Sequence, residues 1–161
     1  MLRTPALPLS QPAGLLATWF GAGLMPRAPG TWGSLAALPV AWIIAYLGGL
    51  PALLAATAIV SVVGCWAAER YIRAHGKDDP GDIVIDEVAG QWLTLLPAAT
   101  DLGLFAAGFV FFRIADILKP WPASWADRRL KGGFGTMVDD LFAAVYSGLA
   151  VLGLRLLLGD F

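Results

Sequence analysis

Long stretches without a charged side chain limit what this sequence can fold into. They cover residues 28–68, 88–100, 102–112 and 141–154. The chain has 11 Lys and Arg and 12 Asp and Glu residues, and 18 of these 23 fall in residues 69–87 and 113–140. Only 14% of the 161 residues are charged and 58% are hydrophobic, whereas a soluble domain averages about 25% charged residues. Too little polar surface remains to cover a soluble globule, so the pattern indicates membrane association.

The uncharged stretches are predicted to be helical, and turn signals divide them. LGGLP at residues 47–51 splits the first stretch into two helices of about 15 residues each. PAATDLG at residues 97–103 separates the next two helices, with Thr100 or Asp101 as an N-cap. A last helix is predicted near residues 137–158. The fold class is therefore all-α, a compact bundle of about five main helices in two hairpins plus a C-terminal helix, although DIVI at residues 82–85 could form a short strand.

Helical hairpins return the chain to the side that it left, so nearly all the charge collects at one end of the bundle. Its basic residues would face the cytoplasm by the positive-inside rule. They are Arg70, Arg73, Lys77, Arg113, Lys119, Arg128, Arg129 and Lys131. Helices of about 15 residues rise only about 22 Å, against about 30 Å of hydrocarbon. Full spanning by every helix is thus not required by the sequence, and a soluble bundle with a very apolar core is the alternative.

Length and composition also limit the number of domains and exclude several functions. The length suits one domain, residues 14–161, after a loose N-terminal tail at residues 1–13. The net charge of −1 gives no basic field for nucleic acid. Cys65, the single cysteine, cannot form an internal disulfide and lies one residue too close to Arg70 for a cysteine-phosphatase loop. One histidine, His75, excludes phosphoryl transfer that needs two.

Two acidic pairs remain as the candidate chemistry, Asp86-Glu87 and Asp139-Asp140, each opening an apolar segment. A carboxylate near hydrocarbon is costly unless it is paired, hydrogen-bonded or bound to a cation. Hard cations such as Mg²⁺ prefer oxygen ligands and often combine carboxylates with phosphate oxygens. We therefore predict that all four carboxylates are catalytic and bind the metal, although a solvated first helical turn is the simpler explanation for either pair alone.

Basic and glycine-rich stretches could hold the complementary anion. In FFRIADILKPWP, Arg113, Asp116 and Lys119 share an arc of one helical face, which suits phosphate oxygens or an intrahelical ladder of ion pairs. APGTWGS and KGGFGT lead into helices whose free N–H groups could bind an anion. The predicted phosphate-binding residues are Thr31, Ser34, Arg113, Lys119, Lys131, Gly132 and Gly133.

Four stretches together resemble the phosphatidylglycerophosphatase A family. They are ATWFGAGLMPRAPGTWGSLAA, DIVIDEVAGQW, FFRIADILKPWP and DRRLKGGFGTMVDD, in the order and spacing of the family. The resemblance implies a Mg²⁺-dependent enzyme of the bacterial inner membrane that converts phosphatidylglycerophosphate to phosphatidylglycerol. The charged positions of the family match Asp86, Glu87, Arg113, Asp116, Lys119, Asp139 and Asp140. Ala115, Thr136 and Ala144 depart from the family's usual residues without removing a charge.

The expected mechanism has water attacking phosphorus directly, with Asp116 orienting the water or protonating the leaving alkoxide. A covalent aspartyl-phosphate is the alternative route. Two other functions compete: a non-enzymatic membrane subunit that transports cations, and a soluble metal-binding bundle. Measuring phosphate release from phosphatidylglycerophosphate, with and without Mg²⁺, distinguishes the phosphatase from these two functions. Oligomeric state is left open.

Overall fold

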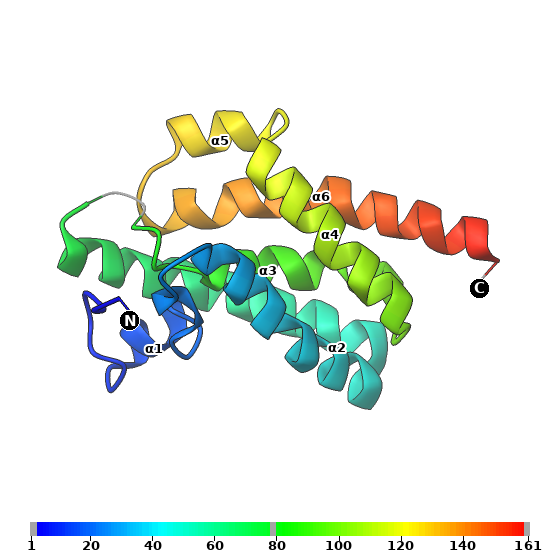
Figure 1. The fold of residues 1–161 in the computed structure, drawn as a ribbon, viewed down its shortest axis with the longest axis horizontal. Coiled ribbons are helices and arrows are strands. Elements are labelled where there is room, and N and C mark those ends of the chain that lie inside the picture. Colours follow the sequence, from blue (N-terminus) through cyan, green and yellow to red (C-terminus); the bar gives the residue numbers. More distant parts are fainter. Residues whose placement is uncertain (1–2, 78–79, 160–161) are drawn as a thin grey trace.

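The computed structural model describes residues 3–77 and 80–159, and over these residues it contains helices and no strand (Figure 1). The predicted all-α fold is confirmed. Residues 82–84 form a turn and an irregular entry to a helix instead of the alternative strand. Residues 1–2 of the predicted tail and residues 160–161 of the predicted domain lie outside the described ranges. The elements are α1 (Pro12–Ala17), η1 (Ala22–Leu24), α2 (Pro29–His75), α3 (Ile85–Thr94), η2 (Leu96–Ala98), α4 (Leu102–Leu118), α5 (Ala123–Arg129) and α6 (Gly132–Leu158).

Helix α2 is a hairpin of two limbs joined at Gly49. This glycine has φ 63° and ψ −162°, which breaks the helix inside the predicted LGGLP turn. The limbs, residues 29–48 and 50–75, rise about 30 and 39 Å at 1.5 Å per residue. The predicted length of about 15 residues was therefore too short. The second limb continues through the charged residues and ends at His75, where Gly76 caps it in the left-handed region with φ 76°.

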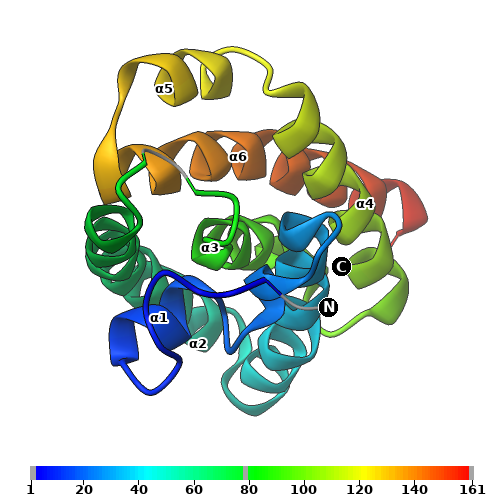
Figure 2. The ribbon, with the colours of Figure 1, turned by 60° about the vertical axis from the view of Figure 1, so that its left-hand side comes forward.

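Helix α3 is short and lies in the middle of the bundle, between α2, α4 and α6 (Figure 2). Its Trp92 indole donates a hydrogen bond to the Ala37 carbonyl of α2 at 3.0 Å. A Cβ on Gly90 would lie 2.5 Å from the Phe112 ring and 3.1 Å from the Asp140 carbonyl oxygen, so this glycine permits close packing on α4 and α6. Asp101, not Thr100, caps α4 by accepting from the Leu104 N–H at 2.7 Å.

Helix α6 begins at Gly132, five residues before the predicted start. Asp139 and Asp140 thus lie about two turns inside the helix instead of at its opening. The preceding α5 is a short helix that the sequence analysis did not anticipate, and it packs on α6.

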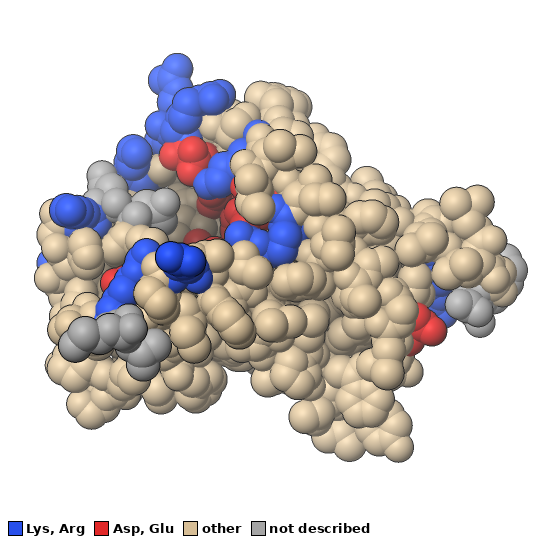
Figure 3. Space-filling model, viewed as in Figure 1, with Lys and Arg blue, Asp and Glu red and all other residues tan. Residues whose placement is uncertain are grey.

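Charge collects at one end of the molecule, as predicted. In Figure 3, acidic side chains lie in a hollow among Lys and Arg at the left end, and a small second group lies at the right. Helices α2 and α6 are long and apolar enough to cross a membrane, with 18-residue windows of mean hydropathy 2.1 and 2.0. Only 22% and 28% of those windows is buried in the protein, which fits lipid-facing helices better than the core of a soluble bundle.

Candidate active site

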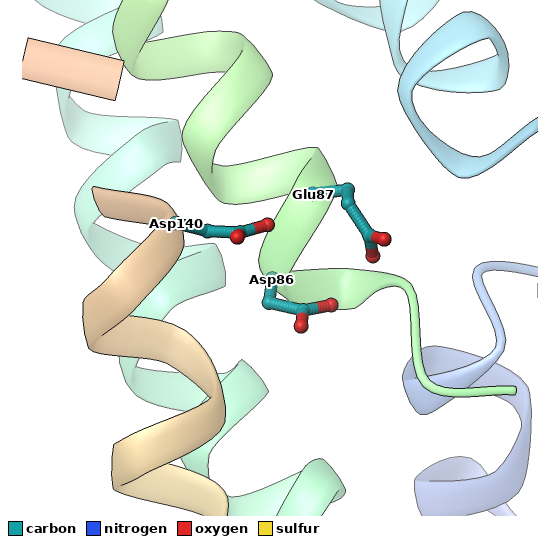
Figure 4. Close-up of side chains that lie close together, drawn as sticks. All are labelled: Asp86, Glu87 and Asp140. Carbon is teal, nitrogen blue, oxygen red and sulfur yellow. The ribbon is translucent and has the colours of Figure 1, made fainter. Parts of the chain in front are cut away.

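Helices α3 and α6 bring three carboxylates together at the charged end. Asp86 and Glu87 lie in the first turn of α3, and Asp140 projects from α6 (Figure 4). One oxygen from each lies within 4.8 Å of the others. Asp86 is 9% exposed and Asp140 3% exposed. The structure therefore groups three of the four predicted metal ligands.

Glycines fix the place where α3 begins. A Cβ on Gly23 would lie 2.0 Å from the Asp82 carbonyl oxygen, and one on Gly33 would lie 2.6 Å from the Val84 Cβ. The Val84 N–H donates to the Ala17 carbonyl at 2.9 Å. Residues 82–84 are therefore held between the turn at η1 and the start of α2. The positive end of the α3 macrodipole then stabilises the acids of its first turn.

The chemistry of the three-acid group fits a divalent cation. Glu87 Oε2 and Asp140 Oδ2 are buried and have no hydrogen-bond partner among the described residues. Buried carboxylate oxygens without partners cost several kcal/mol unless a cation or a proton compensates them. Three carboxylates from two helices offer the oxygen ligands that hard cations prefer.

Burial and the nearby charge of Asp140 raise the pKa of Glu87 to about 8, against an ordinary value of 4.5. Without a cation, Glu87 is therefore mostly protonated at neutral pH. A bound cation has to displace this proton, because ligating carboxylates are ionised.

Arg113 on α4 joins the acidic group to the start of α2. Its Nη1 lies 2.6 Å from Asp116 Oδ2 and 3.8 Å from Glu87 Oε1. The same Nη1 donates to the Ser34 hydroxyl at 3.4 Å, and that hydroxyl donates to the Gly30 carbonyl at 2.9 Å. The carboxyl of Asp116 is in turn within hydrogen-bonding reach of Asp140. The predicted intrahelical ion pair thus forms between Arg113 and Asp116, but it also faces the three-acid group.

Lys119 does not join Arg113 and Asp116 but forms a second polar cluster. It caps α4 with φ 44°, and its ammonium lies 2.5 Å from both Asp127 Oδ1 and Asp139 Oδ2. Burial lowers the pKa of Lys119, but the two carboxylates outweigh it and raise the pKa above its usual value. Asp139 therefore faces Lys119 while its neighbour Asp140 faces α3.

The glycines that lead into α6 make contacts within the protein, which the sequence analysis did not predict. The Gly133 N–H donates to Glu69 Oε2 at 2.9 Å, and a Cβ there would lie 2.2 Å from the Cys65 carbonyl oxygen. Gly132, with φ 69°, allows the turn into α6, and Lys131 is exposed beside it. The N–H of Gly133 thus already has a carboxylate partner within the protein. Thr31 is half-buried in the first turn of α2.

Sequence reasoning missed three contributors to this region. Asp127 on α5 forms an ion pair with Lys119. The two residues are eight positions apart and a loop separates them, so the spacing of a single helix could not predict the contact. Gln91 and Thr94 lie one and two turns after Glu87 and are fully buried, and their side-chain polar atoms have no partner among residues 3–77 and 80–159.

Gly30 is expected to position Glu87 by leaving space for it. A Cβ on Gly30 would lie 2.0 Å from Glu87 Oε1 and 3.2 Å from Arg113 Nη1. We expect Gly30→Ala to displace the carboxylate by about 1 Å or more and to lower kcat about 10–100-fold, while the helix stays folded. Steady-state kinetics and circular dichroism of the purified variant check this.

Gly153→Ala is the matched control, because a Cβ at Gly153 in α6 meets nothing within 4 Å. It should leave kcat unchanged and stabilise the helix by up to about 1 kcal/mol. Equal kcat values for Gly30→Ala and Gly153→Ala would show that Gly30 does not position Glu87.

The family model described as Phosphatidylglycerophosphatase A matches residues 15–155. The chain belongs to the phosphatidylglycerophosphatase A family. The match contains every site residue described above, from Gly30 to Asp140. The resemblance seen in the four sequence stretches is thereby confirmed, and it places the chain among phosphatases that act on a phosphate monoester.

Curated relatives of the phosphatidylglycerophosphatase A family cover nearly the same length. Phosphatidylglycerophosphatase A of Escherichia coli is 44% identical over 143 residues, 88% of this chain and 82% of that protein. The protein of the same name from Haemophilus influenzae is 40% identical over 149 residues, 91% of each chain. A Bacteroides thetaiotaomicron protein named as a candidate phosphatidylinositol-3-phosphatase is 39% identical over 153 residues, 90% of this chain and 94% of that protein. No solved structure matches the chain.

Proposed function

We propose that this chain hydrolyses the phosphate monoester of phosphatidylglycerophosphate to give phosphatidylglycerol, with Mg²⁺ as cofactor. The observation that carries the proposal is the buried three-acid group beside Arg113, within a chain of this family. Residues 14–161 would act as one helical domain in the bacterial inner membrane, with the charged end toward the cytoplasm. This end has most of the Lys and Arg residues, as the positive-inside rule requires.

The charge of the site explains why a cation is proposed. The carboxyl groups of Asp86, Glu87, Asp116 and Asp140 lie close together, and the Arg113 guanidinium pairs with those of Glu87 and Asp116. A phosphate monoester adds further negative charge and would be repelled. Mg²⁺ held by Asp86, Glu87 and Asp140 would neutralise that charge and polarise the phosphoryl group.

The protein's own residues would bind the phosphate and move the proton. Arg113 Nε has no hydrogen-bond partner among the described residues, so the guanidinium keeps donors for phosphate oxygens. Asp116, between Arg113 and Asp140, would orient the attacking water and accept its proton. The same carboxyl would then return a proton to the glycerol alkoxide as the P–O bond breaks. Lys119 would keep Asp139 and α5 in place at the edge of the site.

Phosphate release by the purified protein tests the proposal directly. We expect release from phosphatidylglycerophosphate in mixed micelles, loss of release with EDTA, and recovery with Mg²⁺. Phosphatidylinositol 3-phosphate is the second substrate to assay, because the Bacteroides relative carries that activity in its name. Faster release from the phosphoinositide would reassign the substrate, and release unaffected by EDTA would refute the cation requirement.

Cation binding should release a proton near neutral pH. Burial and the nearby charge of Asp140 raise the pKa of Glu87 to about 8, so Glu87 holds a proton in the neutral range and has to ionise when it binds Mg²⁺. We expect Mg²⁺ binding to release protons at pH 7 and fewer protons above pH 9. The apparent Mg²⁺ affinity should therefore rise with pH up to about pH 8 and level off above it. Calorimetric titrations in buffers of different ionisation enthalpy measure both quantities.

Glu87→Gln is the control for this titration, since an amide cannot release the proton. Its Mg²⁺ affinity should be weaker than that of the wild type and should change less with pH between 6 and 8. Proton release equal to that of the wild type would assign the titration to another carboxyl group.

A further inference from the structure

The N-terminal segment borders an open cavity that lies away from the acids. Residues 3–11 do not hang free of the bundle: Arg3 forms an ion pair with Asp82 at 2.9 Å, and the Ala6 N–H donates to the Tyr71 hydroxyl at 3.0 Å. Between this segment, α1 and the second limb of α2 lies a cavity of about 500 Å³. Its lining includes Leu7, Gln11, Ala13, Trp66, Arg70 and Arg73.

Polarity changes along the wall that α2 provides. Trp66, Arg70 and Arg73 follow one face of the helix at spacings of four and three residues, a rise of about 10 Å. The two arginines lie toward the charged end of the bundle, whereas Trp66 lies toward the apolar stretch. Leu7 and Ala13 face the cavity from the opposite wall. A cationic rim above an apolar wall, with tryptophan at the boundary, matches the polarity of a phospholipid at a membrane surface.

The rim also keeps a net positive charge. Arg70 forms no ion pair within residues 3–77 and 80–159. Arg73 donates through Nε to Glu69 Oε1 at 2.8 Å, and the other oxygen of Glu69 accepts from the Gly133 N–H. Among the described residues, the rim therefore has one carboxylate, that of Glu69, which is shared with α6, and two guanidinium groups. An anion at the rim would complete this charge balance.

The cavity is separate from the three-acid group. Helix α1 and the start of α6 lie on different sides of the second limb of α2 (Figure 2). None of the cavity's lining residues belongs to α3, α4 or α6.

We propose that this cavity binds one anionic phospholipid of the surrounding bilayer. The lipid phosphodiester would lie at Arg70 and Arg73, with Gln11 as a further hydrogen-bond partner. Its glycerol and first methylenes would contact Trp66, Leu7 and Ala13. Basic pockets at the cytoplasmic side of membrane helices recognise anionic headgroups in this way. The inference rests on the proposed membrane location and is independent of the proposed reaction.

Lipid retention by the detergent-purified protein tests the site. Phosphatidylserine is the probe, since it is neither the proposed substrate nor the proposed product, and phosphatidylcholine, a zwitterion without net charge, is the comparison. Native mass spectrometry should show one phosphatidylserine bound at concentrations where phosphatidylcholine is not retained. Arg70→Gln/Arg73→Gln should weaken this binding at least tenfold. Ala74→Trp keeps both charges but fills the cavity from an exposed lining position, and it should weaken binding equally.

Arg128→Gln/Arg129→Gln removes the same charge from α5, at the same end of the molecule, and should change binding less than twofold. An equal loss in this control would mean that general surface charge attracts the lipid, which overturns the site. Wild-type affinity in Arg70→Gln/Arg73→Gln or in Ala74→Trp would also overturn it, as would displacement of the lipid by millimolar inorganic phosphate. The measurement contains no substrate, so its failure and a failure of hydrolysis are separate results.

Discussion

Asp140→Asn should lower kcat by about three orders of magnitude and weaken Mg²⁺ binding in the same protein. Asp140 contributes a buried oxygen to the three-acid group, and Oδ2 has no partner among the described residues. Asparagine keeps the size of the side chain but removes the charge that holds the cation. Cation stabilisation of a transferring phosphoryl group contributes several kcal/mol, which corresponds to about 10³-fold or more. Phosphate release and Mg²⁺ titration of the variant measure the two effects.

Asp139→Asn is the matched comparison, because the two aspartates are adjacent and both buried. Asp139 lies at Lys119, so its replacement should reduce activity by loosening α4 and α5 while Mg²⁺ affinity changes less than threefold. The reverse result, with Mg²⁺ binding lost in Asp139→Asn and kept in Asp140→Asn, would move the cation to the Lys119 cluster.

Arg113→Lys should lower kcat/KM about 100-fold although the charge is kept. Nη1 of Arg113 is already engaged by Asp116 and Ser34, so phosphate has to be bound by the remaining donors of the fork. An ammonium is a single point charge and cannot hold Asp116 and two phosphate oxygens in fixed directions. The loss of one such donor in a transition state costs about 10²–10³-fold. Steady-state kinetics of Arg113→Lys provide the test.

Arg128→Lys controls for the substitution itself, since Arg128 is exposed on α5. It should keep wild-type kinetics. If Arg113→Lys also does, then Arg113 is a structural ion-pair partner and the phosphate is bound elsewhere.

Local sequence signals predicted the helical elements well where a backbone requirement marks a residue. The break at Gly49 and the Asp101 cap are of this kind, since a positive φ and an N-cap hydrogen bond each favour few residue types. Helix lengths were harder to predict, because α2 and α6 continue past the boundaries of the uncharged stretches. In both helices tertiary contacts override the charge pattern, such as the packing of Gly133 against Cys65.

The sequence predicted which residue types form the site, but not the direction in which each side chain points. Adjacent residues on a helix point about 100° apart, so a pair can contribute to one group together, as Asp86 and Glu87 do, or to two groups, as Asp139 and Asp140 do. Whether Asp139 or Asp140 faces α3 depends on how α6 rotates against α3 and α4, and no local pattern encodes that rotation. Asp127 acts only through Lys119, so it did not stand out, and no local pattern showed that Gly30, within APGTWGS, makes room for Glu87.

A small group of charged residues lies at the end of the bundle opposite the three-acid group, and it limits the thickness of membrane that the bundle can match. Asp101 caps α4 there, and Arg155 of α6 donates to the Pro97 carbonyl at 2.8 Å. Along α4 the rise from residue 101 to residue 113 is about 18 Å, and along α6 the rise from residue 140 to residue 155 is about 22 Å. Any tilt shortens both, against about 30 Å of hydrocarbon. In the proposed location this hydrophobic mismatch would thin the bilayer around α4 and α6, and the thinning would bring the headgroup of the proposed substrate closer to the acids.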